Sequence, residues 1–201
     1  MARATRVRNQ RGAGERLRAD LLEAADEILD RTGDPVQVTV RGVAAAVGVA
    51  PNAVYLHFAD REVLLDEVVI ARLEVCTAAI REAVADIDDP LEALYVGHET
   101  YCRLALERPG HYRLLFRRVL HPSHPGVAER LASAGGAYFQ TCIDCCRAVV
   151  DAGRVAAVDP VEMAGAVWAL EHGWCEISLA AGLGRAVVPP PRDALAVLLR
   201  A

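Results

Sequence analysis

The stretch Thr39–Phe58, TVRGVAAAVGVAPNAVYLHF, decides how this chain is organised. Apolar residues from Val40 to Val47 recur at helical spacing, and Thr39 precedes them as a good N-cap. Gly48 follows where the chain must turn, because glycine adopts a positive φ without a Cβ penalty. Pro51 suits the first turn of a second helix. The segment therefore predicts a helix-turn-helix, the motif that places one helix in the DNA major groove.

The same stretch distinguishes residues expected in the core from residues expected to face DNA. Val49 should fill the angle between the two helices, and Val54 and Phe58 should close the apolar seam. Three residues at the start of the second helix are left to face outward: Asn52, Ala53 and Tyr55. Short side chains there would let the helix approach base edges, while the tyrosine hydroxyl can hold a phosphate.

This pattern resembles the DNA-binding head of the TetR family of bacterial transcriptional repressors, over roughly residues 15–65. The matching residues are Thr39-Val40-Arg41-Gly42-Val43-Ala44, Val47-Gly48-Val49, Val54-Tyr55-Leu56-His57-Phe58 and Asp60-Arg61-Glu62. Ala50 departs from the family, which often has serine there, so no side-chain oxygen caps the second helix. Base contacts are therefore not carried over from relatives.

The resemblance implies a set of DNA-binding residues. Those at family positions that touch phosphates are Thr39, Arg41, Tyr55, His57 and Arg61, and those within reach of base edges are Asn52 and Ala53. Pro51, which precedes them, completes the DNA-binding set. Two of them have plainer interpretations. His57 could be only a partly exposed residue at a helix end, and Arg41 could be only a solvated charge.

Charge is distributed unevenly along the chain. The formal net charge is −5, but residues 1–18 carry six arginines against Glu15 alone, a net charge of +5 that leaves −10 for the rest. A basic arm leading into the first helix favours attraction to DNA phosphates. The alternative is a disordered terminus whose charge has no role.

Neither a signal peptide nor a membrane span is expected, because no long apolar run occurs. The six cysteines then lie in a chain of cytosolic character, where thiols stay reduced. We expect a cytoplasmic protein.

The pattern beyond the motif is helical throughout, so the predicted fold class is all-α. The expected elements are helices over about 15–31, 60–84, 90–107, 111–119, 127–152, 160–181 and 192–199, with a loop over 121–126. The expected domains are a basic arm at 1–14, a DNA-binding domain at 15–62 and a ligand-binding and dimerisation domain at 63–201.

The second domain also resembles the TetR family, in the C-terminal type named for a Trp-His-Gly signature. The matching residues are Asp159-Pro160, Trp168 and Glu171-His172-Gly173. The resemblance implies a homodimer whose last two helices pack against those of a second subunit. Small residues suit such close contact: Ala164, Gly165, Ala166, Ala169 and Gly173. A dimer also lets two heads cover a palindromic operator.

An unknown small-molecule effector is expected in this domain. The side chains expected to contact it combine large apolar groups with a few polar atoms, as the linings of small-molecule sites do. They are Tyr101, Phe116, Tyr138, Cys142, Trp168 and His172. Trp168 and His172 rank first, because they lie one helical turn apart on one face. The alternative for each aromatic residue is a place in the core.

Two other chemistries remain open. Cys142, Cys145 and Cys146 share a face of one helix and allow a redox-responsive switch, although buried cysteines usually act as small apolar residues. A metal sensor at the same cysteines lacks a second ligand cluster nearby in sequence, and His121 and His124 lie in a loop beside prolines, where a metal site is the less expected alternative. We expect no metal, no cofactor and no catalytic site, because no phosphate loop or nucleophile motif occurs.

The sequence therefore predicts a ligand-responsive, homodimeric repressor that binds double-stranded DNA. A redox-responsive regulator is one alternative. A helical enzyme or small-molecule-binding protein without a DNA function is the other.

Overall fold

The computed structural model describes residues 13–120, 124–180 and 188–199. Every regular element among them is a helix, which confirms the all-α prediction. The elements are α1 (Ala13–Thr32), η1 (Pro35–Gln37), α2 (Val40–Val47), α3 (Pro51–Val54), α4 (Arg61–Val84), α5 (Pro90–Glu107), α6 (Pro109–Leu120), α7 (Pro125–Asp151), α8 (Pro160–Leu179) and α10 (Pro191–Leu199). Most of the predicted basic arm, residues 1–12, lies outside the described part of the chain.

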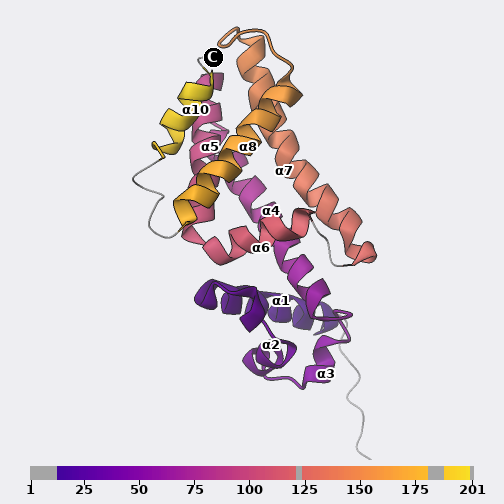
Figure 1. Cartoon of the computed structure of the whole chain (residues 1–201). Helices are drawn as coiled ribbons and strands as arrows, with labels where there is room; N and C mark the ends of the chain where they lie inside the picture. Colours follow the sequence, from indigo (N-terminus) through magenta and orange to yellow (C-terminus); the bar gives the residue numbers. More distant parts are fainter. Residues whose placement is uncertain (1–12, 121–123, 181–187, 200–201) are drawn as a thin grey trace, which may run out of the picture.

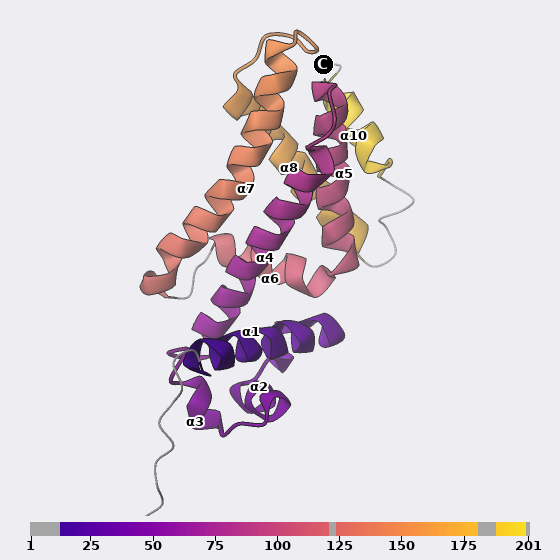
Figure 2. The same ribbon diagram turned by 180° about the vertical axis from the view of Figure 1, so that it is seen from behind.

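The helices form a small head and a larger body. Figure 1 shows α1, α2 and α3 together at one end, with α5, α7, α8 and α10 at the other. Helix α4 runs from the head into the body, and α6 crosses between them, as the view from behind also shows (Figure 2). One continuous helix and one crossing helix therefore connect the two parts.

The turn of the head has the geometry that the sequence predicts. Gly48 has φ 76° and ends α2, and the Val49 amide donates to the Ala44 carbonyl at 2.9 Å. Helix α3 is shorter than predicted, because it is a single turn over Pro51–Val54. The chain then continues through turns, and Phe58 returns to the core with 1% of its surface exposed.

Aspartate caps fix where three long helices begin. Each carboxylate accepts from an open amide of the first turn: Asp60 from Val63 (2.8 Å), Asp89 from Leu91 (3.0 Å) and Asp159 from Val161 (2.7 Å). Helix α7 begins at Pro125, two residues before the predicted start. Proline is favoured at that position, and the His124 ring accepts from the Gly126 amide at 3.2 Å.

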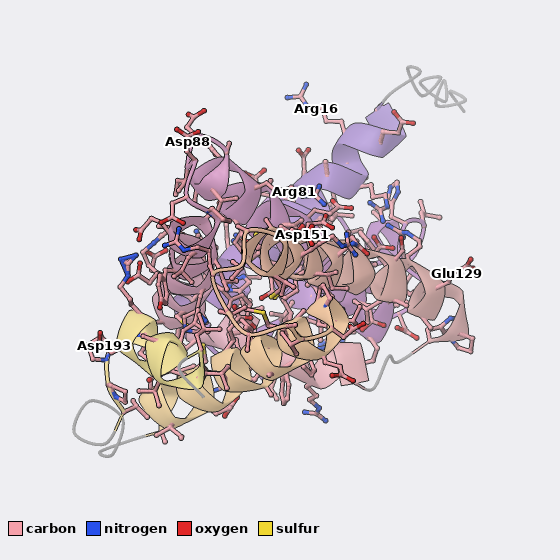
Figure 3. All side chains as sticks on the ribbon, turned by 90° about the horizontal axis from the view of Figure 1, so that it is seen from above. Arg16, Arg81, Asp88, Glu129, Asp151 and Asp193 are labelled. Carbon is pink, nitrogen blue, oxygen red and sulfur yellow. The ribbon has the colours of Figure 1, made fainter. Side chains whose placement is uncertain are left out.

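One arginine counted with the basic arm belongs to the head instead. The Arg18 guanidinium lies 5.1 Å from the centre of the Phe58 ring and 2.7 Å from the Glu67 carboxylate. Its charge is therefore largely neutralised within the fold. Arg16, by contrast, is exposed on α1 and extends away from the body (Figure 3).

The interior of the body is mostly apolar, with a few buried charged side chains such as Glu171, and many of its other charges lie on the surface. Asp88, Glu129 and Asp193 lie at its rim when the molecule is seen from above (Figure 3). Three cysteines are buried among the apolar side chains of the core: Cys102, Cys146 and Cys175. No helix in the described ranges is both long enough and apolar enough to cross a membrane.

One of the small residues of α8 that were expected to contact a second subunit is not available for such contact. Ala164 is fully buried in the core of its own subunit, because its position on the helix points it toward α7. Ala166, Ala169 and Gly173 are exposed, and Gly165 is half-buried with open space around its Cα. A surface of small residues therefore exists on α8 without Ala164.

Candidate functional site

The predicted DNA-binding residues lie on α2, α3 and the segments next to them. Five are exposed: Thr39, Arg41, Pro51, Asn52 and Tyr55, the last at 53%. Ala53 and His57 are half-buried at the same end of the head. We call this set the reading surface.

Thr39 has a structural role that leaves its hydroxyl proton free. Its oxygen accepts from the Gly42 amide at 3.0 Å and caps α2. A hydroxyl accepts through a lone pair and can still donate its hydrogen. Thr39 can therefore cap the helix and donate to a phosphate at the same time.

Arg61 is directed into the protein. Its Nε donates to the Val38 carbonyl at 2.7 Å, a second nitrogen donates to the Pro35 carbonyl, and a third pairs with Glu62 at 2.5 Å. A guanidinium with these partners holds the η1 segment against α4. We therefore expect Arg61 to support the reading surface, and the predicted phosphate contact has no support in this arrangement.

The start of α1 lies beside the reading surface. Gly14 is close enough to His57 that a Cβ added to it would lie 3.9 Å from the imidazole Cε1. Figures 1 and 2 both place the beginning of α1 near α3. Leu56, which the sequence prediction omitted, is 81% exposed between Tyr55 and His57. Leu56 lies on the exposed side of this segment with Tyr55, while Phe58, two residues later, is buried on the opposite side.

A cavity of about 570 Å³ lies in the body between α4, α6, α7 and α8. Five of the six predicted ligand residues line it: Tyr101, Phe116, Tyr138, Trp168 and His172. Cys142 does not; it lines a small neighbouring hollow with His98 and Glu171. The prediction missed the small and aliphatic wall residues, Leu73, Leu115, Ala128, Leu131, Ala132, Gly135 and Gly136, and the aromatic Phe139. Small residues carry no pocket signal in a sequence, because their effect is the space that they leave.

His172 is neutral in the cavity wall. Burial lowers its pKa from 6.5 to about 4. Its Nδ1 lies 3.4 Å from the Tyr101 hydroxyl and 3.2 Å from the Tyr112 hydroxyl. Its ring centre is 4.6 Å from that of Trp168 and 4.6 Å from that of Phe116. The predicted Trp168–His172 pair is therefore in contact, inside an aromatic cluster.

A buried polar chain runs behind the cavity. The Tyr138 hydroxyl donates to the Glu171 carboxylate at 2.6 Å, and the other oxygen of Glu171 lies 3.4 Å from His98 Nδ1. His98 Nε2 lies 3.0 Å from the Pro191 carbonyl, where α10 begins. Burial, followed by the neighbouring Glu171 charge, raises the pKa of Tyr138 well above its usual value. Tyr138 therefore remains a proton donor at neutral pH.

Two of the helix cysteines, Cys142 and Cys145, are held as thiols. A hydrogen bond with Cys146, together with burial, raises the pKa of Cys142. Burial also raises the pKa of Cys145 to about 11. The thiolate is the reactive form, so these values disfavour rapid oxidation. No group of three metal-ligating side chains occurs within the described ranges, and His121 lies outside them.

Ion pairs join the head to the body around Asp26 of α1. The Asp26 carboxylate binds Arg72 of α4 at 2.6 and 2.9 Å and His111 of α6 at 2.9 Å. Burial alone would raise the Asp26 pKa, but the hydrogen bonds from His111 and Arg72 outweigh burial and lower it from 3.8 to about 2. The charged carboxylate is therefore part of the junction.

Asp26→Asn should lower the free energy of unfolding by about 1–2 kcal/mol at pH 7. Because the folded pKa is depressed, the stabilisation is complete above pH 4 and is lost as the pH falls toward 2. The difference between wild type and variant should shrink over that window in urea unfolding curves. Asp20→Asn, on the exposed face of α1, is the matched control. A difference that persists at pH 2 would contradict the assignment.

Two family profiles match the chain. The one described as "Tetracyclin repressor-like, C-terminal domain" covers residues 94–201, and the one described as "Bacterial regulatory proteins, tetR family" covers residues 21–68. A comparison with curated proteins gives no significant match.

Solved structures resemble nearly the whole chain. A protein of unknown function from Rhodococcus sp. RHA1 has a TM-score of 0.75 at 24% identity, over 98% of this chain and 96% of its own. The TetR family transcriptional regulator PfmR from Thermus thermophilus has a TM-score of 0.66 at 22% identity, over 90% and 97%. RolR in complex with resorcinol has a TM-score of 0.67 at 18% identity, over 95% and 89%. These likenesses show a shared fold.

A helix-turn-helix head on a helical body that holds a cavity defines a ligand-responsive, DNA-binding transcriptional regulator. The chain belongs to the TetR family. Members of this family are transcriptional regulators and not enzymes, so the alternative of a helical enzyme is not supported.

Proposed function

We propose that this protein is a cytoplasmic repressor that binds a palindromic operator as a homodimer and releases it when a small molecule fills the cavity. The observation that carries the DNA-binding part is the reading surface, where exposed donors surround α3. Thr39, Arg41, Tyr55 and His57 hold phosphates, while Pro51, Asn52 and Ala53 bring α3 to the base edges. The basic arm at residues 1–14 adds electrostatic attraction.

The dimer is proposed because one head covers only a half-site. Two heads related by a two-fold axis would read half-sites about one helical turn apart. The exposed small residues of α8 allow a second subunit to approach closely: Gly165, Ala166, Ala169 and Gly173. The domain division at residue 62 belongs to the same proposal, although α4 continues through it from Arg61 to Val84.

Helix α6 is the proposed connection between cavity and operator. Leu115 and Phe116 on α6 line the cavity. On the same helix, His111 binds Asp26 of α1 in the head. Arg118 binds Glu62 in the first turn of α4. A molecule that moves α6 would change these ion pairs and the spacing of the two heads, which shifts the population away from the DNA-bound form. RolR was solved with resorcinol, a small aromatic molecule, and we propose a small effector for this chain too.

Arg41→Ala and Tyr55→Phe test the reading surface. Each removes one proposed phosphate contact per subunit, so Arg41→Ala should weaken operator binding about tenfold or more and reduce the salt slope by about 2. Tyr55→Phe removes only a hydroxyl and should weaken binding about fivefold. Mobility shifts on an operator recovered from genomic fragments measure both effects.

Arg103→Ala is the control, because Arg103 is an exposed arginine of α5 in the body. It should leave both the affinity and the salt slope unchanged. Thermal unfolding of all three variants should match that of the wild type. Unchanged affinity in both reading-surface variants would overturn the proposed DNA-binding face.

The redox alternative predicts that operator affinity differs between reductant and peroxide. The raised pKa values of Cys142 and Cys145 argue against it. We therefore expect the same operator affinity in both conditions.

A further inference from the structure

Among the residues that the structure describes, no charged side chain lines the cavity. Aliphatic, aromatic and small residues form it, and the side chains with polar atoms are Tyr101, Tyr138, Trp168 and His172. A carboxylate or phosphate that entered would lose its hydration without gaining a cation, which is costly. A cation would find aromatic faces but no carboxylate in the wall. The oxygens of Glu171 lie behind Tyr138 and are directed to Tyr138 and His98.

Both tyrosine hydroxyls are already engaged. Tyr138 donates to Glu171, so its proton is directed away from the cavity. Within the part of the chain that the structure describes, the hydrogen-bond partner of the Tyr101 hydroxyl is His172 Nδ1, at 3.4 Å. The Tyr112 hydroxyl lies 3.2 Å from the same nitrogen, but it has a second acceptor in the His172 carbonyl at 3.4 Å. Since Tyr101 is buried, its proton should be donated to that nitrogen. His172 Nδ1 is therefore an acceptor.

The tautomer of His172 follows from this contact. Burial keeps the imidazole neutral, so the ring carries one proton. Because Nδ1 accepts, the proton belongs on Nε2. Across the described residues, Nε2 has no hydrogen-bond partner, although His172 lines the cavity. The Nε2–H of His172 is therefore a donor available to a molecule in the cavity, and the indole N–H of Trp168 is a second donor in the wall.

The ring is also fixed in position. Trp168 meets it edge to face at an angle of 81°, and Phe116 lies on it at 38°, both with ring centres 4.6 Å away. Phe139 adds a further edge-to-face contact with Trp168 at 6.4 Å. These rings offer flat apolar surfaces beside the His172 donor, which they hold in a fixed direction.

We propose that the effector is a neutral aromatic molecule with a hydrogen-bond-accepting oxygen, which packs among Trp168, Phe116 and Phe139 and accepts from His172 Nε2–H. This proposal rests on the proposed function, because it specifies which ligand the regulator senses. It makes His172 the residue that selects among aromatic compounds of similar shape.

Three naphthalene probes of nearly equal size test it by calorimetric titration of the full-length protein. They are 2-acetylnaphthalene (an acceptor), 2-ethylnaphthalene (no polar group) and 2-naphthoate (an anion). The ketone should bind about tenfold more tightly than the hydrocarbon, the usual value of one good hydrogen bond. The anion should bind at least about a hundredfold more weakly than the ketone, because it loses its hydration in an uncharged wall.

His172→Phe should lower the affinity for the ketone to that for the hydrocarbon and leave hydrocarbon binding unchanged. His172→Gln, which retains a donor, should restore part of the preference. The carbonyl stretching band of the bound ketone should lie at lower wavenumber in the wild type than in His172→Phe, because a hydrogen bond weakens the C=O bond. If His172→Phe does not fold, the affinities of the three probes for the wild type and for His172→Gln test the proposal.

Equal binding of ketone and hydrocarbon, tighter binding of the anion, or no binding by any probe would each overturn the proposal. Operator binding without any probe is measured in parallel. Intact operator binding with no preference for the ketone would refute only the effector class. Preference for the ketone without operator binding would refute the proposed function and leave the chemistry of the cavity standing.

Discussion

Gly110→Ala should lower the free energy of unfolding by about 1–3 kcal/mol and weaken operator binding. Gly110 is the second residue of α6, and a Cβ there would lie 2.8 Å from the Cα of Gly33 and 2.9 Å from its carbonyl. Gly33 follows the end of α1 with φ 64°, so backbone meets backbone. Because the atoms nearest the added methyl group belong to the backbone and not to a flexible side chain, the head must move relative to α6 to make room for it.

Gly126→Ala is a matched control for this substitution. Pro125-Gly126 opens α7 in the same way that Pro109-Gly110 opens α6. A Cβ at Gly126 would lie 3.5 Å from the His124 ring, an ordinary van der Waals contact. Its unfolding midpoint in urea should match the wild type. Equal stability of the two variants would show that the Gly33–Gly110 contact does not restrain the head.

Glu171→Leu should be the most destabilising change in the body, at about 2–4 kcal/mol. The Glu171 carboxylate accepts from Tyr138 at 2.6 Å and faces His98 at 3.4 Å, and all three side chains are buried. Leucine would leave the Tyr138 hydroxyl without its acceptor. It would also remove the partner that holds His98 toward the Pro191 carbonyl, so α10 should loosen first.

Two substitutions separate the loss of this network from a general effect of leucine. Glu171→Gln retains an oxygen that can accept from Tyr138, and it should lose less than half as much stability. Glu129→Leu replaces an exposed glutamate of α7 and should change the free energy of unfolding by less than about 0.5 kcal/mol. Guanidinium unfolding curves give all three values. A Glu171→Leu variant as stable as Glu129→Leu would refute the role of the network.

Local signals in the sequence predicted the head well. Gly48, Val49 and Asp60 act on their immediate neighbours, so the turn and the start of α4 follow from the chain alone. The same holds for the helix boundaries set by Asp89 and Asp159. The length of α3 did not follow, because its end depends on how Phe58 packs into the rest of the head.

Residues whose role depends on distant parts of the chain were harder to predict. Arg61 belongs to a family pattern of phosphate contacts, yet it binds carbonyls that lie 23 and 26 residues away in sequence. The contact between Gly33 and Gly110 has no sequence signal, because neither glycine stands out within its own turn. Cys142 shares a helix with Tyr138 but faces the neighbouring hollow, a difference that only the packing of α7 on α8 decides.

The central claim is that two copies of the reading surface bind one palindromic DNA site. Selection from a pool of random duplexes with the purified full-length protein, followed by sequencing, tests it most directly. We expect an enriched inverted repeat whose half-site centres lie about 10 base pairs, or a multiple of one helical turn, apart. Enrichment of no sequence, or of a single unrepeated site, would contradict it.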